Sequence, residues 1–257
     1  MTSSRRRFIA GSALAGLLVL SLVGGASWMP ACPLGADPLL PTQSVCAQSL
    51  GGLWRSLVVG LGAGGLSMLV ALSLAVSARV LRGWFGMVVE KGAELFFALP
   101  DVLVLIGIGF AVSVMESEGG RTWPRLGVMV VSLTAIGWAA PARQLQNRLR
   151  TLELQPFVTA AEAVGASRWH VVRAHLLPLA KDYTLTLALL RVPALVLAES
   201  TVSFLGFGLP MDEPSLGAFL GSHADRLLVP GQLHVVLPAW GLLAGLVLLL
   251  RWAGDEA

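Results

Sequence analysis

The sequence predicts an all-α, polytopic membrane protein with about six transmembrane helices. Of its 257 residues, 55% are hydrophobic and only 13% are charged, whereas soluble domains average about 25% charged residues. The charged residues cluster in short blocks between long apolar runs. A spanning helix needs about 20 mostly apolar residues, because its backbone groups must be hydrogen-bonded within the segment. Six runs qualify, at residues 8–28, 56–78, 95–115, 126–142, 184–204 and 234–250.

The basic residues predict the orientation of these spans, because Lys and Arg accumulate in cytoplasmic segments. If the N-terminus is cytoplasmic, the inner segments hold 13 of the 18 Lys and Arg residues. The opposite orientation reverses this bias. We therefore expect both termini to be cytoplasmic. The basic residues alternate with spans instead of forming one patch, so nucleic-acid binding is not expected.

The first span follows Arg5, Arg6 and Arg7, and it permits two interpretations. It is a retained anchor, or it belongs to a cleaved twin-arginine export signal. Cleavage leaves five spans, which conflicts with a cytoplasmic C-terminus, so the anchor is favoured. Cys32 and Cys46 then lie in one outer loop, either as a disulfide or as two thiols. No histidine lies nearby, so a zinc site is not expected.

The second and third spans carry glycines and one acidic residue. In the second span, four glycines would let helices pack closely. These are Gly60, Gly62, Gly64 and Gly65. In the third, Asp101 follows Pro100. A charge at membrane depth is costly, so three interpretations remain: Asp101 lines or gates a pathway, binds backbone groups freed by the proline, or lies in a water-filled inner vestibule.

The longest inner segment covers residues 143–181, after the fourth span. Pro156 interrupts its first helix, and a second short helix then ends at Gly165. Ala160, Ala161 and Val164 are expected along one side of that helix. Small side chains allow close approach of another surface, so this helix is either a docking site or a local helix lying on the membrane.

The fifth span contains two charged residues, Arg191 and Glu199. Eight helical residues rise about 12 Å, so the two are too far apart for a direct ion pair. Each is expected to meet a group on another helix. Arg191 is a candidate pathway residue that would favour carboxylate-bearing cargo, or it is an interhelical contact. For Glu199 we expect a structural role.

Two stretches resemble a known family. The first combines Ala160-Ala161 and Gly165 with His175-Leu176-Leu177-Pro178, and the second covers residues 199–208 and 214–217. Together they resemble the permease subunits of binding-protein-dependent ABC importers, in the peptide and nickel branch. Thr159 stands where that family has an acidic residue. This departure puts in doubt any salt bridge made from that position.

The resemblance implies a fold like that of type I ABC importer permeases. A single domain would cover residues 1–257, with an anchor span at 8–28, core spans over 56–250 and a cytoplasmic coupling loop at 143–181. The coupling loop would contact an ATPase, and Pro178 would set the turn into the fifth span. The implied ATPase-contacting residues are Thr159, Ala160, Ala161, Ala163 and Gly165.

The implied partners are cytoplasmic ABC ATPase subunits, a second and paralogous permease, an extracytoplasmic solute-binding protein and the lipid bilayer of a bacterial inner membrane. The implied cargo is a small solute such as a peptide or a nickel complex. ATP hydrolysis is expected in a separate chain, because a P-loop needs Lys after Gly. Here Lys91 follows Glu90 and Lys181 follows Ala180. No catalytic residue, cofactor or metal is expected.

Two other functions compete with transport. An intramembrane hydrolase would need a nucleophile beside a His or second Asp at span depth, and none of the four histidines lies centrally in a span. A membrane protein with a structural or assembly role has no need for the spaced motif that ends at Pro178.

Overall fold

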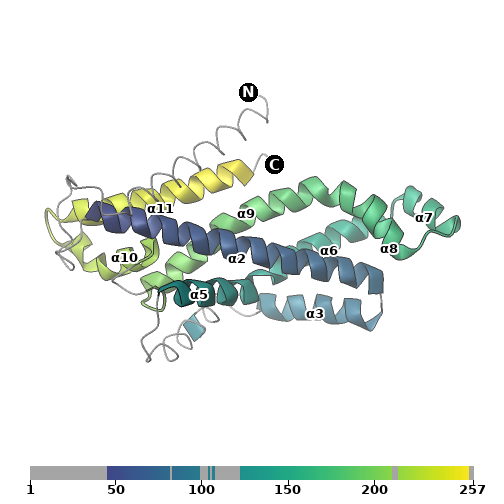
Figure 1. The fold of residues 1–257 in the computed structure, drawn as a ribbon, viewed down its shortest axis with the longest axis horizontal. Helices are drawn as coiled ribbons and strands as arrows, with labels where there is room; N and C mark the ends of the chain where they lie inside the picture. Colours follow the sequence, from purple (N-terminus) through teal and green to yellow (C-terminus); the bar gives the residue numbers. More distant parts are fainter. Residues whose placement is uncertain are drawn as a thin grey trace, which may run out of the picture.

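The computed structural model describes residues 45–81, 83–98, 104, 106–107, 122–209 and 214–254, and helices and their short connections account for all of them (Figure 1). They form an elongated helical bundle. The principal elements are α2 (Val45–Leu81), α3 (Trp84–Ala98), α5 (Thr122–Gly137), α6 (Ala139–Glu153), α7 (Pro156–Ala163), α8 (Arg168–Val171), the π-helical turn η1 (Val172–Leu176), α9 (Leu177–Phe204), α10 (Leu216–Ser222), the 3₁₀ turn η2 (Ala224–Leu228) and α11 (Leu233–Gly254).

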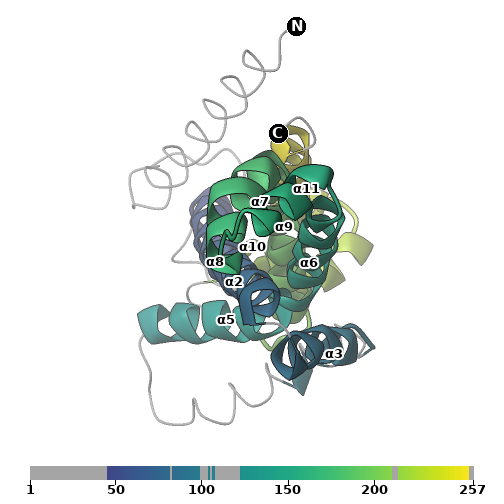
Figure 2. The same ribbon diagram turned by 90° about the vertical axis from the view of Figure 1, so that its right-hand side faces the viewer.

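The two ends of the bundle differ in the elements that they carry. We call one the loop end, where α7 and α8 lie, and the other the α10 end (Figure 1). Figure 2 views the bundle from the loop end, with α7 and α8 nearest the reader. Helix α2 runs the whole length between them and contacts α5, α6, α9 and α11.

Glycines allow α2 to lie close to its neighbours. A Cβ added at Gly60 would collide with Val196 of α9, and one at Gly64 would lie 3.0 Å from Val192 Cγ2. At Gly62 it would lie 3.2 Å from Val130 of α5. The predicted packing role is therefore confirmed at these three positions. At Gly65 no atom of the described residues lies within 4 Å of an added Cβ, so a packing role there stays a prediction.

Three apolar clusters follow one another along the bundle. The α10-end cluster joins α2, α9, α10 and α11, and its largest side chain is Phe219. The middle cluster joins α2, α5 and α9 around Leu133 and Leu195. The loop-end cluster joins the last turns of α2 to α6, α7, η1 and the start of α9, around Leu145 and Leu176. Along α2 the three clusters take up residues 45–57, 59–63 and 68–75 in turn.

The structure confirms the later spans and corrects their bounds. Three described helices are long and apolar enough to cross a membrane, or four if α5 and α6 count as one span bent by 41°. The second predicted span, 56–78, falls within α2. However, residues 45–55 were expected in the outer loop and are helical, because Val45 and Leu53 are buried in the α10-end cluster.

The fifth and sixth predicted spans lie within α9 and α11. Helix α9 continues from α8 and η1, so that Arg168–Phe204 forms one span-length helix. The first predicted span and most of the third lie outside the described residues, as does Asp101.

Cys46 is disulfide-bonded, so the first of the two alternatives that the sequence left open, a disulfide or two thiols, is the one found. Cys32, the second of the two cysteines in the chain, lies outside the described residues.

Candidate functional site

The loop helix α7 is fixed at both ends by local sequence signals. Pro156 occupies its first turn, where a missing N–H does no harm. At its other end Gly165 adopts a left-handed backbone with φ +88°. The Gly165 N–H donates to Glu162 O and the Ala166 N–H to Ala161 O, both at 3.0 Å, which is a Schellman motif. The predicted stop at Gly165 is confirmed.

The two faces of α7 have different surroundings. Val158 is buried, and Ala161 packs against the loop-end cluster. Thr159, Ala160 and Ala163 are exposed. Ala160 and Ala161, which were expected along one side of the helix, therefore have different surroundings. Neighbouring residues on a helix point about 100° apart, and packing against the loop-end cluster turns Ala161 inward.

Exposed apolar side chains surround the outward face of α7. Val164 is 86% exposed and Leu154 81% exposed, while Trp169 and Phe157 are exposed to smaller extents. These four residues come from the end of α6, from α7 with its C-cap, and from α8. We call them, with Thr159, Ala160 and Ala163, the loop-end surface. Several exposed large apolar side chains at one end of a bundle are typical of a contact site.

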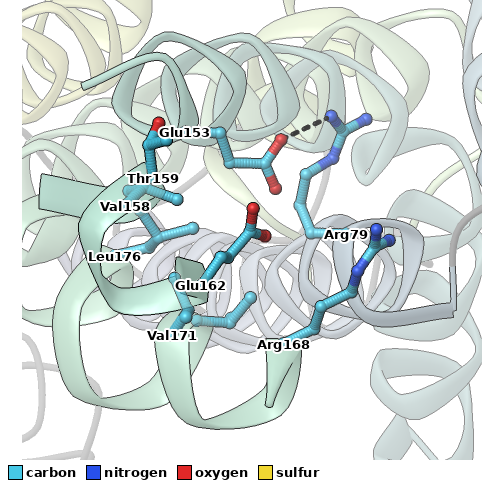
Figure 3. A pocket seen from close by; sticks show the side chains of 9 residues that line it. Arg79, Glu153, Val158, Thr159, Glu162, Arg168, Val171 and Leu176 are labelled. Carbon is cyan, nitrogen blue, oxygen red and sulfur yellow. Dashed lines mark hydrogen bonds and ion pairs between the residues drawn. The ribbon is translucent and has the colours of Figure 1, made fainter. Parts of the chain in front are cut away.

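A small cavity of about 60 Å³ lies behind α7 (Figure 3). Arg79 of α2 pairs with Glu153 of α6 at 3.4 Å. Thr159, Glu162 and Arg168 also line the cavity, and the Glu162 carboxylate points into it (Figure 3). Thus Thr159 lies beside a charged cluster although it carries no charge itself. The remaining walls are Val158, Val171, Val172 and Leu176.

Sequence reasoning did not find the Arg79–Glu153 pair. The two residues are 74 positions apart, so no helical spacing links them. One feature of the sequence could have suggested this pair. Both residues stand in the last turn of a helix, and both helix ends are predicted on the same side of the membrane. This pair ties the end of α2 to the end of α6, next to the start of α7.

Pro178 does not set a turn, contrary to the expectation. It lies in the first turn of α9, inside the continuous helix Arg168–Phe204. The π-helical turn before it shifts the hydrogen-bond pattern, since the Leu177 N–H donates to Val172 O. That shift accommodates a residue with no N–H of its own. The change of direction occurs at Gly165 instead, and Ser167 caps the new helix by accepting from the His170 N–H at 3.3 Å.

Glu199 is fully buried at the α10 end and is surrounded by hydroxyl groups. Ser203 donates to Oε1 at 2.6 Å, and Ser56 of α2 donates to Oε2 at 3.0 Å. Ser200 donates to Oε2 at 3.4 Å. The Ser56 oxygen in turn accepts from the Leu216 N–H at 3.3 Å. One carboxyl group therefore joins α2, α9 and α10, as expected for a group that meets another helix.

The second stretch of the resemblance also lies at this contact. Ser215 caps α10 by accepting a backbone N–H at 3.2 Å. A Cβ added at Gly217 would collide with the backbone of Ser200, and one at Gly221 with the backbone of Phe204. These two glycines, four residues apart, allow α10 to lie directly on α9.

Arg191 stands in the middle of α9, away from Glu199, and lines a separate cavity with residues of α5. Within the described ranges no group of three or more His, Cys, Asp or Glu residues could hold a metal ion. Of the residues predicted for coupling, the structure brings Thr159, Ala160 and Ala163 to one exposed surface. It places Arg191 and Glu199 at different sites.

Replacing Gly165 with alanine is expected to loosen the end of α7. A left-handed conformation costs a residue with a Cβ about 1–2 kcal/mol, and no atom of the described residues within 4 Å adds a steric effect. Hydrogen exchange of the α7 amides should therefore become about 5- to 30-fold faster, because 1.4 kcal/mol is a factor of ten. Gly165→Asn is the matched control and should cost less. Unchanged exchange in Gly165→Ala would contradict the role of this glycine.

Comparison with known proteins assigns a family to this arrangement. The family model for the binding-protein-dependent transport system inner membrane component matches residues 66–253. The dipeptide transport system permease protein DppC of Bacillus subtilis is 28% identical over 204 residues, which are 76% of this chain and 60% of that protein. DppC of Lactococcus lactis is 24% identical over 77% of this chain and 54% of its own length. The chain thus spans little more than half the length of these relatives.

A solved structure supports the same fold. The inward-facing MetNI methionine ABC transporter contains a chain that superposes with a TM-score of 0.62 at 23% identity. The match covers 79% of this chain and 91% of that chain. At this identity the likeness concerns the fold alone.

Proposed function

This chain belongs to the family of binding-protein-dependent transport system inner membrane components, and from that premise we propose that it is the permease subunit of an ATP-driven importer. It would form part of the translocation path for a small solute, and it would couple to a separate ATPase through the loop-end surface. Both named relatives are permease proteins of dipeptide transport systems, so a peptide or similar small solute is the proposed cargo.

The observation that carries this proposal is the exposed helix α7 and its connections. On one side α6 continues α5 after a bend of 41°, and on the other α8, η1 and α9 form one helix through to Phe204. A displacement of α7 would therefore reach both spans through two short connections, residues 154–155 and 164–167. Thr159, Ala160 and Ala163 are exposed on α7, and Gly165 ends the helix with a left-handed backbone.

The assembly that we propose contains further chains. Cytoplasmic ATPase subunits would bind the loop-end surface, a second and paralogous permease would complete the path, and an extracytoplasmic binding protein would deliver the solute. The loop end would face the cytoplasm, with both termini on that side, because the inner segments carry most of the basic residues. The family match favours this function over an assembly protein or an intramembrane hydrolase.

The test is a photo-crosslink from α7 to the ATPase. A photoreactive amino acid at Ala160, on the exposed face, should crosslink to the partner ATPase in membranes, with a yield that changes when ATP is added. The same residue at Ala161, which packs inward, should crosslink mainly within the chain. At Leu228, which is 88% exposed at the α10 end, it should give no ATPase product. If position 160 gives none while both chains are present and folded, the coupling proposal fails.

A further inference from the structure

A second cavity lies inside the bundle at Arg191. It has a volume of about 100 Å³ and is lined by Leu133, Ile136, Gly137, Arg191, Ala194, Leu195 and Ala198. Arg191 stands at the centre of α9, which runs from Leu177 to Phe204, so about 20 Å of helix separate it from either end. An ionisable residue at such depth is a functional-site candidate, because a charge there is costly.

The position of the guanidinium within this cavity is defined by its neighbours. A Cβ added at Gly137 would lie 3.4 Å from Arg191 Nη2 and 3.2 Å from Ser67 Cβ of α2. Gly137 is the last residue of α5, where the bend into α6 begins. The guanidinium therefore lies at the broken part of a span, and the absence of a side chain at Gly137 leaves room for it.

The cavity opens toward the surface shared by α5 and α9. Leu133, Gly137 and Leu195 are buried, whereas Arg191, Ala194 and Ala198 are half-buried. The open side thus carries the arginine and two small side chains. A cavity needs roughly 10–15 Å³ to hold one water molecule, so this one has room for a group of several atoms beside the guanidinium.

We propose that this cavity binds a carboxylate group of the transported solute, with Arg191 as the binding residue. Guanidinium presents a planar set of five N–H donors that matches a carboxylate with two parallel hydrogen bonds. Five donors also allow Arg191 to keep other contacts while it binds the ligand. The surrounding walls are apolar, and a low local dielectric strengthens such bonds. The inference rests on the proposed transport function and names the chemical group that the path recognises.

The charge of the cavity can be measured without transport. In Ala194→Cys, an anionic sulfonate and a cationic trimethylammonium methanethiosulfonate would react with the new thiol one turn from Arg191. Each reaction rate is divided by the rate of the same reagent with free cysteine. The anionic reagent should then react at least about fivefold faster than the cationic one, because a guanidinium ~8 Å away attracts the first and repels the second even at the dielectric of water. Cys46 is disulfide-bonded, and the parent chain without Ala194→Cys gives the background.

Two substitutions test whether Arg191 is the source of that preference. Arg191→Lys should keep it, and Arg191→Gln should abolish it, with folding of each checked by monodisperse elution. An equal preference in Arg191→Gln, or failure of both reagents to react in the folded protein, overturns the proposal. Because the α7 crosslink does not depend on this cavity, failure here is distinguishable from failure of the proposed function.

Protection of the thiol identifies the ligand. Trialanine should slow modification of Ala194→Cys, by roughly twofold at a concentration equal to its dissociation constant, and trialanine amide at the same concentration should not. Protection by both peptides means that the carboxylate is not recognised. If chloride slows modification of the thiol as much as trialanine does, the cavity binds simple anions and does not recognise a carboxylate. Either outcome overturns the assignment to a solute carboxylate.

Discussion

Replacing Glu199 with alanine should sharply reduce the yield and thermal stability of the folded protein. The carboxyl group is fully buried and accepts hydrogen bonds from Ser56, Ser200 and Ser203. Alanine would leave these hydroxyls without their acceptor and create a cavity. Unsatisfied buried groups cost about 1–3 kcal/mol each and core truncations about 2–5 kcal/mol, so we expect a loss of at least about 3 kcal/mol. The midpoint for loss of the monodisperse peak on heating measures it.

Two controls separate the network from a general loss of charge. Glu199→Gln keeps the shape and one acceptor oxygen but presents an NH₂ to a donor, so about half of the effect is expected. Glu94→Ala removes an acidic residue whose partner Lys91 is on the exposed surface of α3, and it should change stability little. A Glu199→Ala protein as stable as Glu94→Ala would show that the buried network does not hold α10.

Replacing Gly217 with alanine should separate α10 from α9. The new Cβ would collide with the backbone of Ser200, which cannot move aside as a flexible side chain could. Overpacking of this kind costs about 1–3 kcal/mol. The same heating assay should show a lower midpoint, and Gly221→Ala should behave similarly because its Cβ would collide with the backbone of Phe204.

Gly245→Ala is the matched control for this effect. Gly245 lies inside α11, and no atom of the described residues lies within 4 Å of the position of its Cβ. Alanine is the better helix former by about 1 kcal/mol, so this variant should be as stable as the parent or more so. If Gly217→Ala and Gly245→Ala shift the midpoint equally, the close contact between α10 and α9 contributes nothing to stability.

Much of the helical architecture could be predicted from the sequence. Apolar runs located the later spans because each crosses the bilayer with few interruptions, and Pro156 and Gly165 marked the two ends of α7 by their backbone requirements. The start of α2 at Val45 could not be placed by the same reasoning. Residues 45–55 combine small, polar and apolar side chains, and what makes them helical is burial against α10 and α11.

The candidate site was predicted in part. The sequence located the loop helix, but helical spacing gives the angle between Ala160 and Ala161 without showing which of them faces the bundle. Packing against the loop-end cluster decides that question. Pro178 was likewise expected at a turn, because proline usually ends a helix. The π-helical turn that lets the helix continue through Pro178 could not be predicted from composition.

Helix α2 has 37 residues, which at 1.5 Å per residue is about 55 Å. The hydrocarbon core of a bilayer is about 30 Å thick. About 25 Å of this helix must therefore lie outside the hydrocarbon core, unless the helix tilts steeply.

For the part of the bundle in water, burial of Leu145 and Leu176 is driven by their exclusion from water. For the part in lipid, where tails are as apolar as leucine, cohesion depends on close fit at Gly60 and Gly64. One continuous helix thus joins two regions that are stabilised by different forces, and urea, temperature and lipid composition would act on them separately.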